Sequence, residues 1–223
     1  MLRVIYDWSE VWALLIPLFY IYKAKKTPVY LKPVKVFVWV SLILNLAQMI
    51  IWYRLKLHLP EFPAILQSNT FIYNLLSATR LITFSLFFIL LGQHFMPRIK
   101  KIIPFGFLLF MIINFIFYEQ FFSVAISSRI LATEAALLLF YCIQYFIFQL
   151  TESNSISLPK QKGFWVVIGL SIYVAVNFFI FLFYEYLTDS AKTFAVDMWD
   201  VHNAVFIILC IFIAIQFNQK DDK

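Results

Sequence analysis

Long apolar stretches separated by short polar connections make up nearly the whole chain. Seven of them have about the length of a membrane-spanning helix: Val4 to Tyr22, Val34 to Tyr53, Asn69 to Leu91, Ile102 to Tyr118, Ile130 to Leu150, Gly163 to Leu187 and Trp199 to Phe217. They are too long and too uniformly apolar for the alternating strands of a membrane β-barrel. Because a backbone in lipid must satisfy its own hydrogen bonds, the pattern predicts seven helices.

The first stretch departs from the pattern of the other six. Asp7 and Glu10 lie inside it, so its uninterrupted apolar run extends only from Val11 to Tyr22. The acids precede this run and the lysines of the KAKK sequence at 23–26 follow it, which is the reverse of a cleavable signal peptide. We expect the stretch to remain as a membrane helix, with a six-helix protein as the alternative.

Composition points to an integral membrane protein. Of the 223 residues, 63% are hydrophobic and only 13% are charged, and the mean hydropathy is +0.84, far from the balance of a soluble domain. Spans of about 20 residues with short connections use up this length. We expect one all-α transmembrane domain over residues 1–223, with no room for a separate soluble catalytic or nucleic-acid-binding domain.

Lysine and arginine are distributed unevenly between the two sides of the predicted bundle. The connections after the first, third and fifth stretches, together with the tail, carry twelve of them, and the opposite side carries five. The positive-inside rule places these connections and the C-terminus in the cytoplasm and the N-terminus outside. Acidic residues gather on the predicted outer side: Asp7, Glu10, Glu61, Glu119, Glu185, Asp189, Asp197 and Asp200.

Arg80 lies near the middle of the third stretch, about 16 Å along the helix from Asn69. A charged side chain at that depth costs about 2.5 to 3.5 kcal/mol, so it should face the protein interior, a wet cavity or a carboxylate. We expect an intramembrane charge pair with Glu134, with Asp7 or Glu10 as the alternative acids. A purely structural pair remains an alternative to a functional one.

Other polar side chains fall at the midplane or in the outer half of the predicted helices. Helical spacing puts Trp199, His202 and Asn203 on one face of the last helix. Amides in membrane helices commonly serve as interhelical hydrogen-bonding groups, and His202 suits packing as well as ligand or proton binding. An apolar pocket with a few convergent polar groups is nevertheless the default binding site. The hypothetical ligand site comprises Tyr73, Asn74, Arg80, Glu134, Asn177, Trp199, His202 and Asn203.

Several classes of function conflict with these residues. A retinal protein needs a Schiff-base lysine in its last helix, and residues 199–217 contain none. An intramembrane metal hydrolase needs converging histidines, whereas His94 belongs to the opposite side from His58 and His202. We expect no enzymatic activity, no metal and no cofactor. A small transporter should show internal repeats with Gly- or Pro-broken helices at matching positions, and neither is evident, but this does not exclude a transporter.

Three short patterns carry a resemblance that covers about half the chain. They are the Tyr73-Asn74 pair, the FWVVIGLSIYVAVNFFIFLFYEYL run of the sixth stretch, and Trp199, His202 and Asn203 as W-x-x-H-N. These resemble small bacterial seven-helix proteins related to the membrane sensor modules of two-component systems. The resemblance implies a sensory role in a bacterial plasma (inner) membrane and ligand contacts by those five residues. Only residues 218–223 follow the last stretch, so we expect no fused kinase or cyclase.

The sequence therefore predicts a receptor-like or sensory protein whose output passes through another chain. Its expected partners are the lipid bilayer, a separate histidine kinase or other signalling protein, and a small-molecule ligand, but not nucleic acid. An anionic ligand is expected if Arg80 is incompletely neutralised, and a cationic one if the acids dominate. The alternative is a small transporter or channel subunit.

Overall fold

The computed structural model describes residues 2–57, 69–122, 126–151 and 158–219, and this part of the chain contains helices and no strand. The all-α prediction is thus confirmed. Two 3-10 turns, Val29–Leu31 and Leu158–Lys160, accompany the α-helices. The α-helices are α1 Leu2–Asp7, α2 Ser9–Lys23, α3 Lys32–Lys56, α4 Thr70–Leu90, α5 Pro97–Phe117, α6 Ser128–Thr151, α7 Phe164–Ser190 and α8 Lys192–Asn218.

Six of the described helices, α3 to α8, are long and apolar enough to cross a membrane. Their number and hydropathy make this an integral membrane protein. Helix α2 has 15 residues, a length of about 22 Å, against a hydrocarbon core of about 30 Å. Helix α2, which corresponds to the first of the seven predicted spans, is therefore shorter than the other six helices.

The first predicted helix, Val4 to Tyr22, is wrong as a continuous segment. The chain turns at Trp8, which separates α1 from α2. The Trp8 carbonyl accepts the backbone N–H groups of residues 11 and 12 and so starts a new helix, while the Trp12 indole donates to the Ile5 carbonyl at 2.8 Å. The break occurs between the two acids, whose side chains both line a cavity described below. The helix is thus interrupted at the polar positions 7 to 10, although the residues on both sides are apolar.

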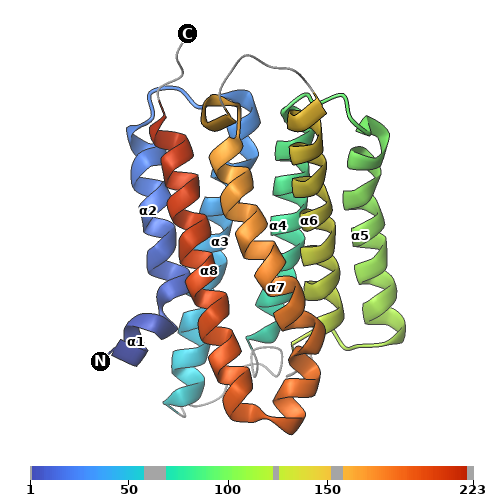
Figure 1. The fold of residues 1–223 in the computed structure, drawn as a ribbon. Coiled ribbons are helices and arrows are strands. Elements are labelled where there is room, and N and C mark those ends of the chain that lie inside the picture. Colours follow the sequence, from blue (N-terminus) through green and yellow to red (C-terminus); the bar gives the residue numbers. More distant parts are fainter. Residues whose placement is uncertain (1, 58–68, 123–125, 152–157, 220–223) are drawn as a thin grey trace.

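Helices α2 to α8 run alternately up and down (Figure 1). Contacts run from α2 to α3, α4, α6, α7 and α8 in turn, and α8 packs back against α2 to close the ring. The two helices of this last contact run in the same direction. Helix α5 lies outside the ring, against α4 and α6.

The two ends of the bundle differ in charge. We call the end where α2, α4, α6 and α8 begin the acidic end, which is the lower end in Figure 1, and the opposite end the lysine-rich end. Asp7 and Asp197 lie at the first end, and Lys23 and Lys162 lie at the second. His58 and Glu61, which the sequence assigns to the outer side, lie outside the described residues.

The core nearer the lysine-rich end is filled by aromatic side chains. Phe84, Phe87, Phe88 and Tyr141 are fully buried there. The rings of Phe88 and Tyr141 stack with their centroids 5.1 Å apart. Helices α7 and α8 approach so closely at Gly169 that a Cβ on this residue would lie 2.6 Å from that of Phe212. At Gly169 an added methyl group would therefore have no room.

Helix α5 begins five residues before the predicted stretch at Ile102, because Pro97 suits the first turn of a helix. Lys100, expected in a connection, therefore lies within the helix and is only 2% exposed. Its Nζ donates to Gln93 Oε1 at 3.4 Å. Apolar stretches locate helices reliably, but a helix continues into polar residues when its ends are stabilised.

Candidate functional site

Arg80 occupies the centre of the ring, where α4 faces α6 and α7. Its guanidinium forms two contacts with the Glu134 carboxylate, one through Nε to Oε1 and one from Nη2 to Oε2 at 3.0 Å. Its Nη1 donates to the Tyr173 hydroxyl. Arg80 is 8% exposed and Glu134 is 2% exposed. A bidentate pair of this kind offsets the desolvation of both charges and leaves no net charge on the pair.

Asn177 fixes the protonation of one nitrogen of the His202 ring. Its Nδ2 donates to the Tyr173 carbonyl at 2.8 Å, so its Oδ1 is the atom that faces His202 Nδ1 at 2.6 Å. Because an amide oxygen only accepts hydrogen bonds, Nδ1 carries a hydrogen. The other ring nitrogen, Nε2, therefore accepts a hydrogen bond if the imidazole is neutral and donates one if the ring is a charged imidazolium.

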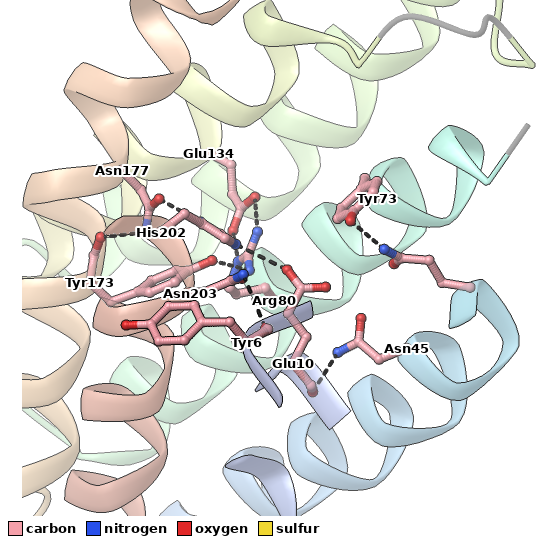
Figure 2. A network of polar contacts seen from close by, with 11 residues as sticks. Tyr6, Glu10, Asn45, Tyr73, Arg80, Glu134, Tyr173, Asn177, His202 and Asn203 are labelled. Carbon is pink, nitrogen blue, oxygen red and sulfur yellow. Dashed lines mark hydrogen bonds and ion pairs between the residues drawn. The ribbon is translucent and has the colours of Figure 1, made fainter. Parts of the chain in front are cut away.

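The partner of this nitrogen is Glu10, whose Oε1 lies 3.2 Å from His202 Nε2. A neutral imidazole with its hydrogen on Nδ1 and an ionised carboxylate would both be acceptors here, so this contact holds one proton. Figure 2 shows how the network extends from Glu134 through Arg80 and Tyr173 to Asn177, His202 and Glu10. It joins α6, α4, α7, α8 and α2 within the membrane-length part of the bundle.

Two cavities reach this network from the acidic end. The outer cavity has a volume of about 210 Å³ and is lined by Asp7, Glu10, Gln48, Met49, Trp52, Asn69, Tyr73, Trp199 and Asn203. The inner one has a volume of about 20 Å³, enough for about one water molecule. Its polar lining consists of Glu10, Ser41, Asn45, Tyr73, Arg80 and His202. Glu10 and Tyr73 line both cavities and therefore form the boundary between them.

Helix α3 contributes a polar stripe to these cavities. Ser41, Asn45, Gln48 and Trp52 are spaced by four, three and four residues, which places them on one helix face. Asn45 Nδ2 donates to the Glu10 carbonyl at 3.2 Å, and Gln48 Nε2 donates to the Tyr73 hydroxyl. The predicted site did not include this stripe, although its helical spacing is visible in the sequence.

Some amide oxygens on the cavity walls have no hydrogen-bond partner within the described part of the chain. They belong to Asn45, Gln48 and Asn203, each buried to more than nine-tenths. The Asn203 nitrogen donates to the Tyr6 carbonyl at 3.5 Å. A carbonyl only accepts, so the nitrogens of Asn45 and Asn203 are fixed on their backbone partners and their oxygens remain as acceptors.

The structure brings together seven of the eight residues proposed for a ligand site: Tyr73, Arg80, Glu134, Asn177, Trp199, His202 and Asn203. The Trp199 ring contacts the rings of Tyr73 and His202, with centroids 5.3 and 5.0 Å away. Asn74 is not among them, because it points elsewhere and donates to the Phe121 carbonyl at 3.5 Å. One residue further along a helix turns a side chain by about 100°, which is enough to remove it from the site.

Sequence reasoning did not place Glu10 at the centre of the network. It considered Glu10 only as an alternative partner for Arg80, whereas the carboxylate contacts His202. The available signal was an acid that interrupts an otherwise apolar stretch, since buried ionisable residues in membranes are usually functional or paired. Trp52 and Asn69 were also missed.

The fold and this interior define a helical integral membrane protein with a buried ionisable network open to one end. Comparison of the chain with models of known families, with curated proteins and with solved structures finds no match. Within the described residues, no three His, Cys, Asp or Glu side chains come close enough together to hold a metal ion. What the protein does must therefore be argued from the cavity and the network.

Proposed function

We propose that this protein is a receptor-like sensory protein that binds a small molecule in the outer cavity and passes its output to a separate signalling chain. The observation that supports this most directly is the position of Glu10. Its side chain lines the cavity and also contacts His202 on α8. A molecule bound beside Glu10 therefore acts on a contact that joins the first and last helices of the ring.

A binding event becomes a signal only if the molecule prefers one arrangement of the bundle, because equal affinity for two arrangements shifts nothing. The Glu10 to His202 contact supplies such a difference. A ligand that forms hydrogen bonds with Glu10 competes with this contact, and α2 is then held less tightly against α8. The bistable element in this proposal is the packing of α1 and α2 on the rest of the ring.

A small transporter or channel subunit is the second candidate. Transport would require a path from the inner cavity to the lysine-rich end. The aromatic core closes that route, with Phe84, Phe88 and Tyr141 fully buried in it. The sensory function needs no opening of this half, and it is the one that the geometry supports better.

We further propose that the acidic end faces outward across a bacterial inner membrane, with α2 as the seventh span. The unequal distribution of Lys and Arg supports this orientation. A tag at the N-terminus is expected to be accessible from outside, and tags at the C-terminus and near Lys100 are expected to be accessible only from the cytoplasm. Protease protection of tagged chains in intact cells measures this. An N-terminal tag in the cytoplasm would mean that α2 does not span.

The sensory function is tested through the partner. Cross-linking in membranes, followed by purification in mild detergent, is expected to recover a signalling protein such as a histidine kinase. Its activity should then be measured beside the wild-type chain and beside Asn203→Ala and His202→Gln variants that accumulate normally. We expect both variants to change the partner's activity or its response. A lipid-facing substitution such as Ile112→Leu is the control, and partner activity that ignores all three variants would contradict the proposal.

A further inference from the structure

We propose that the inner cavity binds one ordered water molecule, which joins the Arg80 to Glu134 pair to the contact between Glu10 and His202. Three features of the cavity support this inference: its size, the oxygens on its wall that have no partner, and the donors that Arg80 supplies. The site is inferred from the cavity alone. Its role as a relay between the two pairs rests on the proposed function.

The size of the inner cavity suits a single water molecule. Its volume is about 20 Å³, and a cavity of about 10–15 Å³ is already large enough for one water. Small cavities with apolar walls stay dry, whereas a water is held where the wall offers about two to four polar partners. The polar side chains that line this cavity are those of Glu10, Ser41, Asn45, Tyr73, Arg80 and His202. The wall therefore meets the condition for a hydrated cavity.

Two side chains of α3 that line the inner cavity carry oxygens with no hydrogen-bond partner among the described residues. They are Ser41 Oγ and Asn45 Oδ1, on residues that are 1% and 3% exposed. The Asn45 nitrogen donates to the Glu10 carbonyl, which cannot donate in return, so the amide oxygen is fixed as an acceptor. Figure 2 shows this oxygen directed towards the space between Glu10 and Tyr73. Because an unpaired buried oxygen is costly, a donor in the cavity would stabilise the fold.

Arg80 supplies donors to the same cavity. Its guanidinium has N–H groups beyond the three that bind Glu134 and Tyr173, and the residue lines the cavity. Since Glu134 already neutralises Arg80, the bound molecule needs no charge of its own. It must accept from Arg80 and donate to Asn45 Oδ1, which excludes a metal cation and a simple anion. Water does both and has the right size.

The inner cavity also adjoins the other ionisable pair, because Glu10 and His202 line it. The water is therefore a common neighbour of the pair on α4 and α6 and of the contact between α2 and α8. A ligand that draws Glu10 away from His202 changes the hydrogen bonds of the water, and through them those of Arg80. In this way an event at the outer cavity reaches α4 in the centre of the bundle.

A structure of the purified protein at a resolution that shows ordered water tests the site directly. We expect one density peak within hydrogen-bonding distance of Ser41 Oγ, Asn45 Oδ1 and the Arg80 guanidinium. The absence of a peak, or a peak that contacts neither Ser41 nor Asn45, would overturn the inference.

Two matched serine substitutions test the site in solution. Ser41→Ala removes a group that bonds the water. Ser77→Ala is the control, because this serine is 0% exposed and its hydroxyl also has no partner among the described residues, but it does not line the inner cavity. We expect Ser41→Ala to lower the midpoint of thermal unfolding by about 2–4 °C, and Ser77→Ala to leave it unchanged or raise it. Equal shifts in the two variants would contradict the water site.

A combined variant tests whether Ser41 and Asn45 share the same water. Asn45→Leu replaces the second partner by an apolar side chain of similar size, so the water is no longer held. Adding Ser41→Ala to Asn45→Leu should then have much less effect on the unfolding midpoint than Ser41→Ala alone. Strictly additive shifts would mean that the two side chains do not bind one molecule.

The partner assay separates this inference from the proposed function. If the water acts as a relay, Ser41→Ala changes the activity of the signalling partner and Ser77→Ala does not. A missing water peak together with a partner that still responds to Asn203→Ala would contradict the water site and leave the sensory function standing. A water peak together with a partner that ignores all of these variants would instead contradict the sensory function.

Discussion

The two halves of this bundle are built from the same helices, but one half is filled by aromatic side chains and the other contains polar groups and cavities. Towards the lysine-rich end, aromatic rings fill the core, and α7 and α8 lie so close together that only a glycine fits at position 169. Towards the acidic end, the interior holds charges, two cavities and amides whose oxygens have no partner among the described residues. The first half fixes the positions of the helices. The second is less tightly packed, and its cavities are lined by the polar groups of the proposed ligand site.

Breaking the charge pair should have the largest effect. Arg80→Ala and Glu134→Ala each leave an uncompensated buried charge, and we expect each to lower the free energy of unfolding by about 3–5 kcal/mol. Because the double variant removes both charges, it should recover part of the loss. Thermal unfolding in detergent and the amount of protein in membranes measure this. Strictly additive losses would mean that the two side chains stabilise the protein independently.

Overpacking the aromatic half should have the next largest effect. In Gly169→Ala the new Cβ would lie 2.6 Å from that of Phe212, so α7 and α8 must separate. We expect a loss of about 1–3 kcal/mol, measured in the same unfolding assay. Gly106→Ala on α5 is the control, because nothing lies within 4 Å of the added carbon. There alanine should stabilise the helix by up to about 1 kcal/mol. Equal effects at the two glycines would show that α7 and α8 are not tightly packed at Gly169.

The smallest effect is expected at an amide of the cavity wall. Asn203→Leu removes one long hydrogen bond and an oxygen that is already unpaired, so stability should change by no more than about 0.6 kcal/mol. Asn177→Leu is the comparison, since both ends of that amide are bonded and His202 would lose its acceptor. We expect it to cost about 1–3 kcal/mol. Similar losses in the two variants would place Asn203 among the structural amides.

Sequence alone locates α4 closely, from Asn69 to Leu91 against the observed Thr70–Leu90, because an apolar run of bilayer length has few alternatives to a helix. It also narrows the partners of Arg80 to a few acids, since an unpaired charge at that depth is costly. The position of Glu10 was harder to predict. Its contact with His202 depends on α2 packing against α8, and no local pattern encodes which distant helices meet. The prediction that Asn74 belongs to the site was wrong for a related reason. The exact rotation of a helix about its axis is set by the helices that pack against it.

The closing of the ring by α2 and α8 also determines when the cavity can form. A ribosome adds about 5–20 residues per second, so His202 is made on the order of ten seconds or more after Glu10. Until then Glu10 is a carboxyl group on a short helix without the partner it later contacts. The groups that α8 contributes to the proposed ligand site, Trp199, His202 and Asn203, are therefore the last of its groups to be synthesised.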